Sequence, residues 1–154
     1  MLRTRRASYA LVAALAIATV ACSSDSSSSS AASTSSSSGS DTSTSGEVAS
    51  TVKDFSITLD PTEVAAGQVK FSINNEGPST HEFVVVQTDT APGDLPVDGA
   101  LVSEDGIDVI GEAEDIAPST TVDLVLTLEA GQYVIICNIE GHYAQGMNAG
   151  LTVT

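Results

Sequence analysis

The 154-residue chain is poor in cations, in aromatic side chains and in the residue types that usually carry chemistry. It has no tryptophan, two histidines and two cysteines, and its 5 lysines and arginines face 20 acidic residues, for a net charge of -15. So negative a charge argues against binding to nucleic acids or to anionic membranes, because both need a basic face. Two cysteines exclude a disulfide-dense scaffold, and two histidines exclude metal clusters built from many imidazoles. Any chemistry must use very few special side chains.

The first residues have the pattern of an export signal. Three arginines precede an apolar stretch over residues 10–21, which is too short for a membrane-spanning helix of about 20 residues. The sequence Thr-Val-Ala-Cys at 19–22 resembles a lipobox. We therefore expect residues 1–21 to be a signal peptide and Cys22 to carry a lipid anchor. Ordinary signal-peptidase cleavage, which would leave Cys22 as a free thiol, is the alternative.

A serine-rich segment follows the predicted anchor. Residues 23–46 contain 15 serines and almost nothing that can bury apolar surface, so the segment is predicted to be disordered. Residues 22–46 would then form a lipid-anchored tether, although a plain spacer or a glycosylated stalk has the same composition. The whole pattern predicts an exported protein on the outer face of the cell membrane, in the periplasm or on the cell surface.

Residues 47–154 are predicted to form one all-β domain. Apolar side chains alternate with polar ones over residues 55–59, 69–73 and 122–128, which is the period of a half-buried strand. The runs 83–86 and 133–136 are almost continuously apolar, as in strands covered on both faces. Seven or eight short strands separated by Gly and Pro turns predict a Greek-key β-sandwich. Residues 88–106 are expected to be a long connection with a short helical turn near Leu101.

The candidate chemistry lies after the second apolar run. Cys137, His142 and Met147 form a Cys-x4-His-x4-Met pattern, and the remaining histidine, His81, stands 56 residues before Cys137. Taken singly, such residues are usually a buried cysteine, a core methionine and surface histidines. Together they form a candidate metal site, because both histidines and the only cysteine of the predicted domain belong to the set.

This donor set suits copper. Two imidazoles and a thiolate can surround a copper ion in a plane, with a thioether as a weak axial ligand. Gly141 and Gly146 would supply the tight turns just before two of the ligands. We expect His81 to reach the site from a neighbouring strand and to fasten the two sheets together at one end. The predicted ligands are His81, Cys137, His142 and Met147.

The loop resembles the copper loop of cupredoxins, the type 1 or blue copper proteins, a family that includes plastocyanin-like domains. Plastocyanins have a shorter Cys–His gap and azurins a shorter His–Met gap, whereas four residues in both gaps are more similar to rusticyanin and sulfocyanin. Residues 74–83 resemble the turn before the first copper histidine. The resemblance implies an eight-stranded Greek-key sandwich with one type 1 copper ion, Cu(I)/Cu(II), bound through Nδ1 of both histidines. It also implies a backbone N–H near Glu82 that donates to the Cys137 sulfur, although many cupredoxins carry Asn or Ser at the position of Glu82.

The implied function is one-electron transfer between redox partners. Four protein ligands leave no open coordination position for a substrate, and no histidine remains for a second metal centre, so we do not expect an enzyme. Copper capture, storage or delivery is the alternative, because the same ligands would bind Cu(I). A structural surface module without metal is a third possibility.

The surface around the copper site suggests how a partner docks. His142 is the expected electron exit, and a small apolar patch of Pro78, Tyr143, Ala144 and Ala149 would surround it. Residues 47–154 hold 18 acids and 2 lysines, for a net charge of -16, with six acids between Glu104 and Asp115 that are distant in sequence from the ligand loop. Such a surface would steer a basic redox partner protein towards a monomeric carrier. Solubility, or adaptation to a salty medium, explains the acidity equally well.

Overall fold

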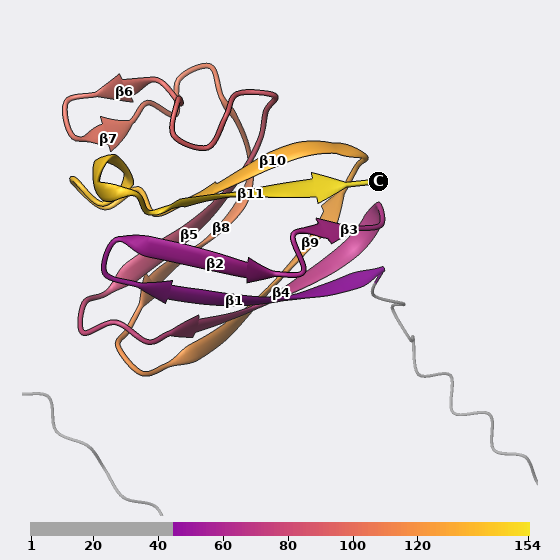
Figure 1. Ribbon diagram of the computed structural model, residues 1–154, viewed down its shortest axis with the longest axis horizontal. Helices are drawn as coiled ribbons and strands as arrows, with labels where there is room; N and C mark the ends of the chain where they lie inside the picture. The colour runs from indigo at the N-terminus through magenta and orange to yellow at the C-terminus, as the bar shows by residue number, and fades with distance from the viewer. Residues whose placement is uncertain (1–44) are drawn as a thin grey trace, which may run out of the picture. The chain divides into compact units, whose positions relative to one another are not determined.

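The computed structural model describes residues 45–154, which form two packed β-sheets (Figure 1). The predictions of a signal peptide, a lipid anchor at Cys22 and a tether that ends at residue 46 fall almost wholly outside the described residues. One sheet has the strand order β2-β1-β4-β9, with β1 Gly46–Lys53, β2 Ser56–Asp60, β4 Gly67–Asn75 and β9 Thr121–Leu128. The other has the order β3-β11-β10-β5-β8, with β3 Glu63–Val64, β5 His81–Gln87, β8 Asp108–Ile116, β10 Gly131–Ile136 and β11 Asn148–Val153.

Two short strands and one helical turn complete the described elements. Strands β6 Val97–Asp98 and β7 Leu101–Val102 form a small hairpin, and the 3-10 turn η1 spans Tyr143–Gln145. Within this part of the chain, no helix has the length and apolar composition needed to span a membrane. The predicted all-β sandwich is confirmed, and eight of the described strands have five or more residues.

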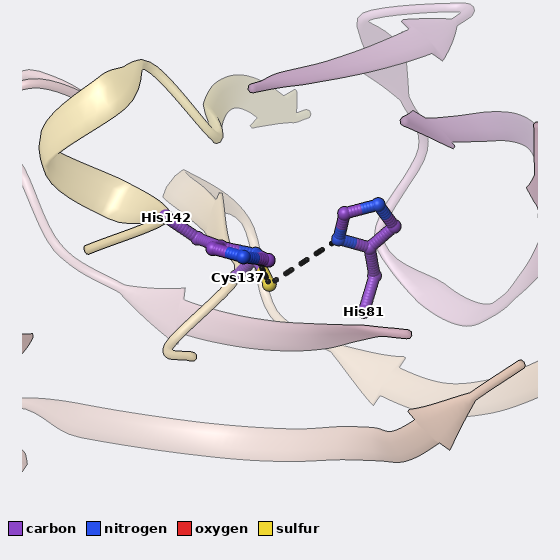
Figure 2. A group of neighbouring side chains, drawn as sticks. All are labelled: His81, Cys137 and His142. Carbon is purple, nitrogen blue, oxygen red and sulfur yellow. Dashed lines mark hydrogen bonds between the residues drawn. The ribbon is translucent and has the colours of Figure 1, made fainter. Parts of the chain in front are cut away.

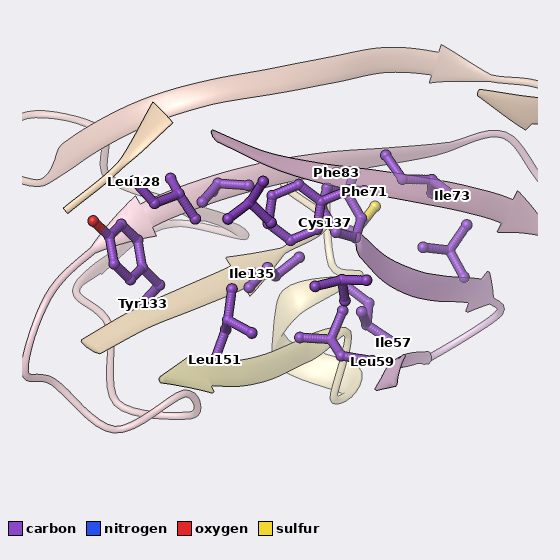
Figure 3. Packing of buried hydrophobic residues seen from close by; sticks show 14 of the residues in the cluster. Ile57, Leu59, Phe71, Ile73, Phe83, Leu128, Tyr133, Ile135, Cys137 and Leu151 are labelled. Atoms are coloured by element: carbon purple, nitrogen blue, oxygen red, sulfur yellow. The ribbon is translucent and has the colours of Figure 1, made fainter. Parts of the chain in front are cut away.

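The core between the sheets is built from the alternating strands that the sequence predicts. Val69, Phe71 and Ile73 of β4 are fully buried, and the Phe71 ring meets the ring of Phe83 from the opposite sheet at 5.4 Å between centroids. Burying a side chain of this size stabilises the fold by about 1.5–3 kcal/mol. Figure 3 shows this cluster, with Cys137 among its members. The cysteine sulfur therefore lies at the edge of the main hydrophobic core.

A second cluster covers the outer face of the five-stranded sheet. Val84 and Val86 of β5 and Ile136 of β10 pack there against Leu95 and Val102. The latter two belong to the long connection over residues 88–106, which folds back across the sheet. This cover explains why β5 and β10 are continuously apolar, as predicted.

Two local predictions are wrong. Phe55 does not begin an inward-facing strand but lies in the turn between β1 and β2, with φ at 65° and 45% of its surface exposed. Leu101 lies in β7 and not in a helical turn. Phe55 continues the apolar alternation of β2, and β7 has only two residues, so neither residue can be assigned from hydrophobicity alone.

Candidate metal centre

The predicted ligand loop joins β10 to β11 and is closed by its own backbone. The N–H of Cys137, the residue after β10, donates to the carbonyl of Met147 at 3.1 Å. Gly141 and Gly146 have φ of 80° and 105° and directly precede His142 and Met147. These left-handed conformations are accessible to glycine at little cost, so the predicted turns are confirmed.

The structure brings three of the predicted donor atoms together. Suitable donor atoms of His81, Cys137 and His142 all lie within 4.8 Å of one another. The Cys137 Sγ lies 3.9 Å from Nδ1 of His81 and 3.3 Å from Nδ1 of His142 (Figure 2). Both histidines therefore turn Nδ1 towards the sulfur, as the resemblance implies. His81 and Cys137 are fully buried, and His142 is partly exposed.

Met147, the fourth predicted ligand, lies at the end of the ligand loop, just before β11. It is fully buried and belongs to the same core cluster as Cys137. Two imidazole nitrogens, one thiol and one thioether are the donors of a type 1 copper site, and three of the four side chains are fully buried here. The donor set thus fits one type 1 copper ion.

The environment of Cys137 favours a metal thiolate over a free one. The backbone N–H of Glu82 donates to Sγ at 3.3 Å, which confirms the hydrogen bond that the resemblance implies. Burial raises the pKa of the Cys137 thiol above its usual value, and the backbone N–H groups of Glu82 and Ile139 oppose this rise. A metal cation must therefore displace the thiol proton when it binds.

His81 is held as a neutral ring. Burial lowers the pKa of His81, the nearby His142 lowers it further, and the carboxylate of Asp54 acts in the opposite direction. Neutral imidazole is the form that ligates metals.

The loop before His81 is organised by a residue that the sequence analysis did not single out. Asn75, at the end of β4, is fully buried, and its side-chain amide donates to the carbonyls of Ser79 and Ile116, both at 2.8 Å. Its side-chain oxygen accepts from the N–H of Gly77 at 2.9 Å. The sequence feature that could indicate this role is an asparagine between a strand and a Gly-Pro turn, where asparagine side chains often bond to the backbone.

The predicted ligands lie on the five-stranded sheet or on the loop between two of its strands. His81 begins β5, and β5 pairs with β10, the strand that ends just before Cys137. His81 thus reaches the site from a neighbouring strand, as expected, but a metal ion bound to these ligands would not itself join the two sheets. The opposite sheet reaches the site instead through the turn between β1 and β2, whose residues Asp54 and Phe55 contact the two histidines.

The predicted apolar patch needs correction at Tyr143. This side chain is only 5% exposed, and its hydroxyl donates to the Pro92 carbonyl and accepts from the Leu95 N–H, both at 2.8 Å. Ala149 is partly buried against the core, whereas Pro78 and Ala144 are exposed. Tyr143 therefore anchors η1 to the long connection and does not form a docking surface.

Acidic side chains gather beside the site despite their distance in sequence. Burial raises the pKa of Glu82, and Glu114, Glu112, Asp115 and Glu104 raise it further. Strand β8 carries most of these acids and pairs with β5, which places them next to Glu82. The pairing of the strands thus converts an acidic segment of the sequence into an acidic border of the candidate metal centre.

Solved structures with the same fold are blue copper proteins. Reduced auracyanin from Roseiflexus castenholzii is 23% identical over 73% of this chain and 98% of its own, with a TM-score of 0.51. Rusticyanin from Thiobacillus ferrooxidans is 20% identical over 71% and 78%, with a TM-score of 0.54. An azurin from Methylomonas sp. strain J is 19% identical over 71% and 98%, with a TM-score of 0.55. At these identities the similarity establishes the fold.

The family assignment comes from the sequence. A search of curated protein sequences gave no match. The family model described as "Cupredoxin-like domain" matches residues 11–148, which is most of the chain. With the sandwich fold and the type 1 donor set in agreement, the chain belongs to the cupredoxin-like domain family.

Proposed function

We propose that this protein is an extracytoplasmic type 1 copper protein that carries single electrons between redox partners. His81, Cys137, His142 and Met147 would ligate one copper ion, which alternates between Cu(I) and Cu(II). The observation that carries the proposal is the convergence of three donor atoms within 4.8 Å of one another at a buried end of the sandwich.

The protein supplies a donor set that is already assembled. The ends of the ligand loop are joined at Cys137 and Met147. Asn75 holds the loop before His81 through Gly77 and Ser79 and links it to Ile116 of β8. Ligands held in place by packing and hydrogen bonds move little when the charge at the site changes, which favours fast electron transfer. Four protein donors also leave no position for a substrate, so the site favours a carrier over an enzyme.

His142 is the proposed point of electron exit. It is the partly exposed residue of the set, whereas His81, Cys137 and Met147 are fully buried. The exposed ring of Phe55 stands edge-on to His142 at 5.9 Å between ring centroids. Together with the exposed Pro78 and Ala144, Phe55 gives a partner an apolar surface at the most accessible ligand.

We further propose a basic redox partner and a location on the outer face of the cell membrane. An acidic border beside Glu82 favours a basic redox partner protein that docks on a monomer. The N-terminal sequence supports export and attachment to the outer face of the membrane through Cys22.

Electrochemistry separates a carrier from a copper handler. A carrier gives a reversible Cu(II)/Cu(I) couple and rapid electron self-exchange, measured by voltammetry and by NMR line broadening in mixtures of the two forms. A protein for copper capture or delivery gives a colourless Cu(I) form that passes its metal to a chelating acceptor without redox cycling. The burial of three of the four donors favours the first result, because a delivery site must expose its ligands to exchange metal.

A further inference from the structure

The turn between β1 and β2 contacts both histidines of the candidate site from the opposite sheet. Asp54 places Oδ1 3.2 Å from Nε2 of His81. The next residue, Phe55, packs its ring edge-on against His142 and adopts a φ of 65°, which is costly for a bulky side chain. Backbone strain of this kind persists where the surroundings impose it, and here it presents two adjacent side chains to the site.

The contact between His81 and Asp54 is the natural pairing for two buried atoms. His81 is fully buried, and among the described residues neither its Nε2 nor Asp54 Oδ1 has an aligned hydrogen-bond partner. The two atoms are within hydrogen-bonding distance of an Nε2 donor and a carboxylate acceptor. Asp54 Oδ2 accepts a hydrogen bond from the Ser79 hydroxyl at 3.3 Å, which holds the carboxylate in place.

Backbone atoms pack closely around Nε2 of His81 and leave little room for another hydrogen-bond partner. A methyl group on Gly77 would lie 2.9 Å from Nε2 of His81, 3.0 Å from Cα of Lys53 and 3.1 Å from the backbone nitrogen of Asp54. The loop before His81 and the β1–β2 turn are thus packed closely around this nitrogen. Figure 2 shows that Nδ1 on the same ring faces Cys137 while the other nitrogen points away.

We propose that Asp54 is a positioning residue of the copper site, which holds His81 with its proton on Nε2 and the lone pair of Nδ1 directed at the metal. The proposal rests on the ligand set of the proposed function. A carboxylate behind a ligating imidazole fixes the tautomer and the ring orientation and makes the ring a stronger donor. Its negative charge also stabilises Cu(II) relative to Cu(I), so Asp54 lowers the reduction potential of the site.

The test compares Asp54→Asn and Asp54→Ala with the wild-type chain and with Asp108→Asn. Asp108→Asn is a matched control because it removes the same charge from β8 at the other end of β5, where Asp108 pairs with Gln87 and not with His81. Nitrogen-15 NMR of the metal-free proteins reports the His81 tautomer. We expect the Nε2–H form in the wild-type and Asp108→Asn proteins and a mixture of tautomers in Asp54→Ala.

Copper loading gives the second readout. We expect a higher reduction potential in Asp54→Asn, a Cu(II) affinity lower by about 10- to 100-fold in Asp54→Ala, and wild-type values in Asp108→Asn. An unchanged tautomer and an unchanged potential in both Asp54 variants would overturn the proposal. If the wild-type protein lacks a copper–thiolate band, the proposed function fails, while the metal-free tautomer experiment still decides the role of Asp54.

Discussion

Asn75 is a buried polar side chain that bonds to Gly77 and Ser79 of the loop before His81 and to Ile116 at the end of β8. We predict that Asn75→Ala lowers the free energy of unfolding of the metal-free protein by about 2–4 kcal/mol, because two buried backbone groups and one partly buried group lose their partner. Urea unfolding measures this change.

Asn74 is the matched control for this prediction. It precedes Asn75 in β4, but its side chain makes exposed contacts with Glu76 and Thr121, so Asn74→Ala should cost less than about 0.5 kcal/mol. Equal losses of stability in the two variants would show that Asn75 has no special structural role.

The variant Ala144→Lys tests whether electrons leave the protein at His142. A lysine at this exposed position should slow electron self-exchange severalfold and leave the visible spectrum unchanged, because it places a solvated charge on the contact surface without reaching a ligand. Ala65→Lys is the control, since Ala65 is exposed beside Ala66, which pairs with Thr154 at the far end of β11. Unchanged self-exchange in Ala144→Lys would mean that electrons leave elsewhere.

The sequence indicates the four ligands but not the residues that hold those ligands in position. Cys137, His142 and Met147 lie close together in the chain, so their spacing alone indicates a shared site. Asp54 lies 27 residues before His81 and on the other sheet, and no local pattern marks an aspartate that becomes a neighbour only through packing. Tyr143 was misplaced because its position after His142 does not reveal that the long connection covers it.

At the level of elements, the long connection fastens the ligand loop. Besides the two hydrogen bonds of Tyr143, Asn138 pairs with the backbone of Val102, and the N–H of Gly141 donates to the Ala100 carbonyl at 2.9 Å. Figure 1 shows the β6–β7 hairpin beside η1. The connection therefore clamps the loop that carries three of the four proposed ligands.

Tyr143→Phe tests this clamp. We expect a loss of about 1–3 kcal/mol in the free energy of unfolding and faster amide hydrogen exchange over residues 138–147, because the Leu95 N–H and the Pro92 carbonyl lose their partner. Tyr133→Phe is the control, since it removes a hydroxyl that donates to the Glu129 carbonyl, outside the loop. Loop exchange that matches the wild type in Tyr143→Phe would rule out the clamp.

The elements themselves differ in how far the sequence reveals them. Strands β4, β9 and β10 follow clear alternating or continuous apolar patterns, so their existence is predictable. Strand β8 is mostly solvent-facing and acidic, and the inward positions of β1 are Val48, Ser50 and Val52, where the serine interrupts the apolar alternation. Backbone pairing with a neighbouring strand determines both: β1 pairs with β4, and β8 pairs with β5.

For the whole molecule, the acidic surface is almost unopposed. The only two lysines of residues 47–154 already pair with acids, Lys53 with Glu76 at 3.8 Å and Lys70 with Asp123 at 3.1 Å. We predict that electron transfer with a small cationic redox complex slows as salt rises, whereas transfer with an anionic complex accelerates. Stopped-flow kinetics over a range of ionic strength measures both trends.

The border beside Glu82 can be separated from the overall charge. Replacing Glu112 and Glu114 by Gln should reduce the salt dependence with the cationic complex more than replacing Glu63 and Glu129 by Gln, which removes the same charge elsewhere. Equal effects of the two pairs would assign the steering to net charge alone.

The most direct test of a type 1 copper site is the visible absorption spectrum of the purified protein titrated with Cu(II). An intense thiolate-to-copper band towards the red end of the visible, which saturates at one equivalent of copper and is absent in Cys137→Ser, is the predicted result. A wild-type spectrum without that band, or one that Cys137→Ser leaves unchanged, would contradict the assignment of Cys137, His81, His142 and Met147 as the ligands.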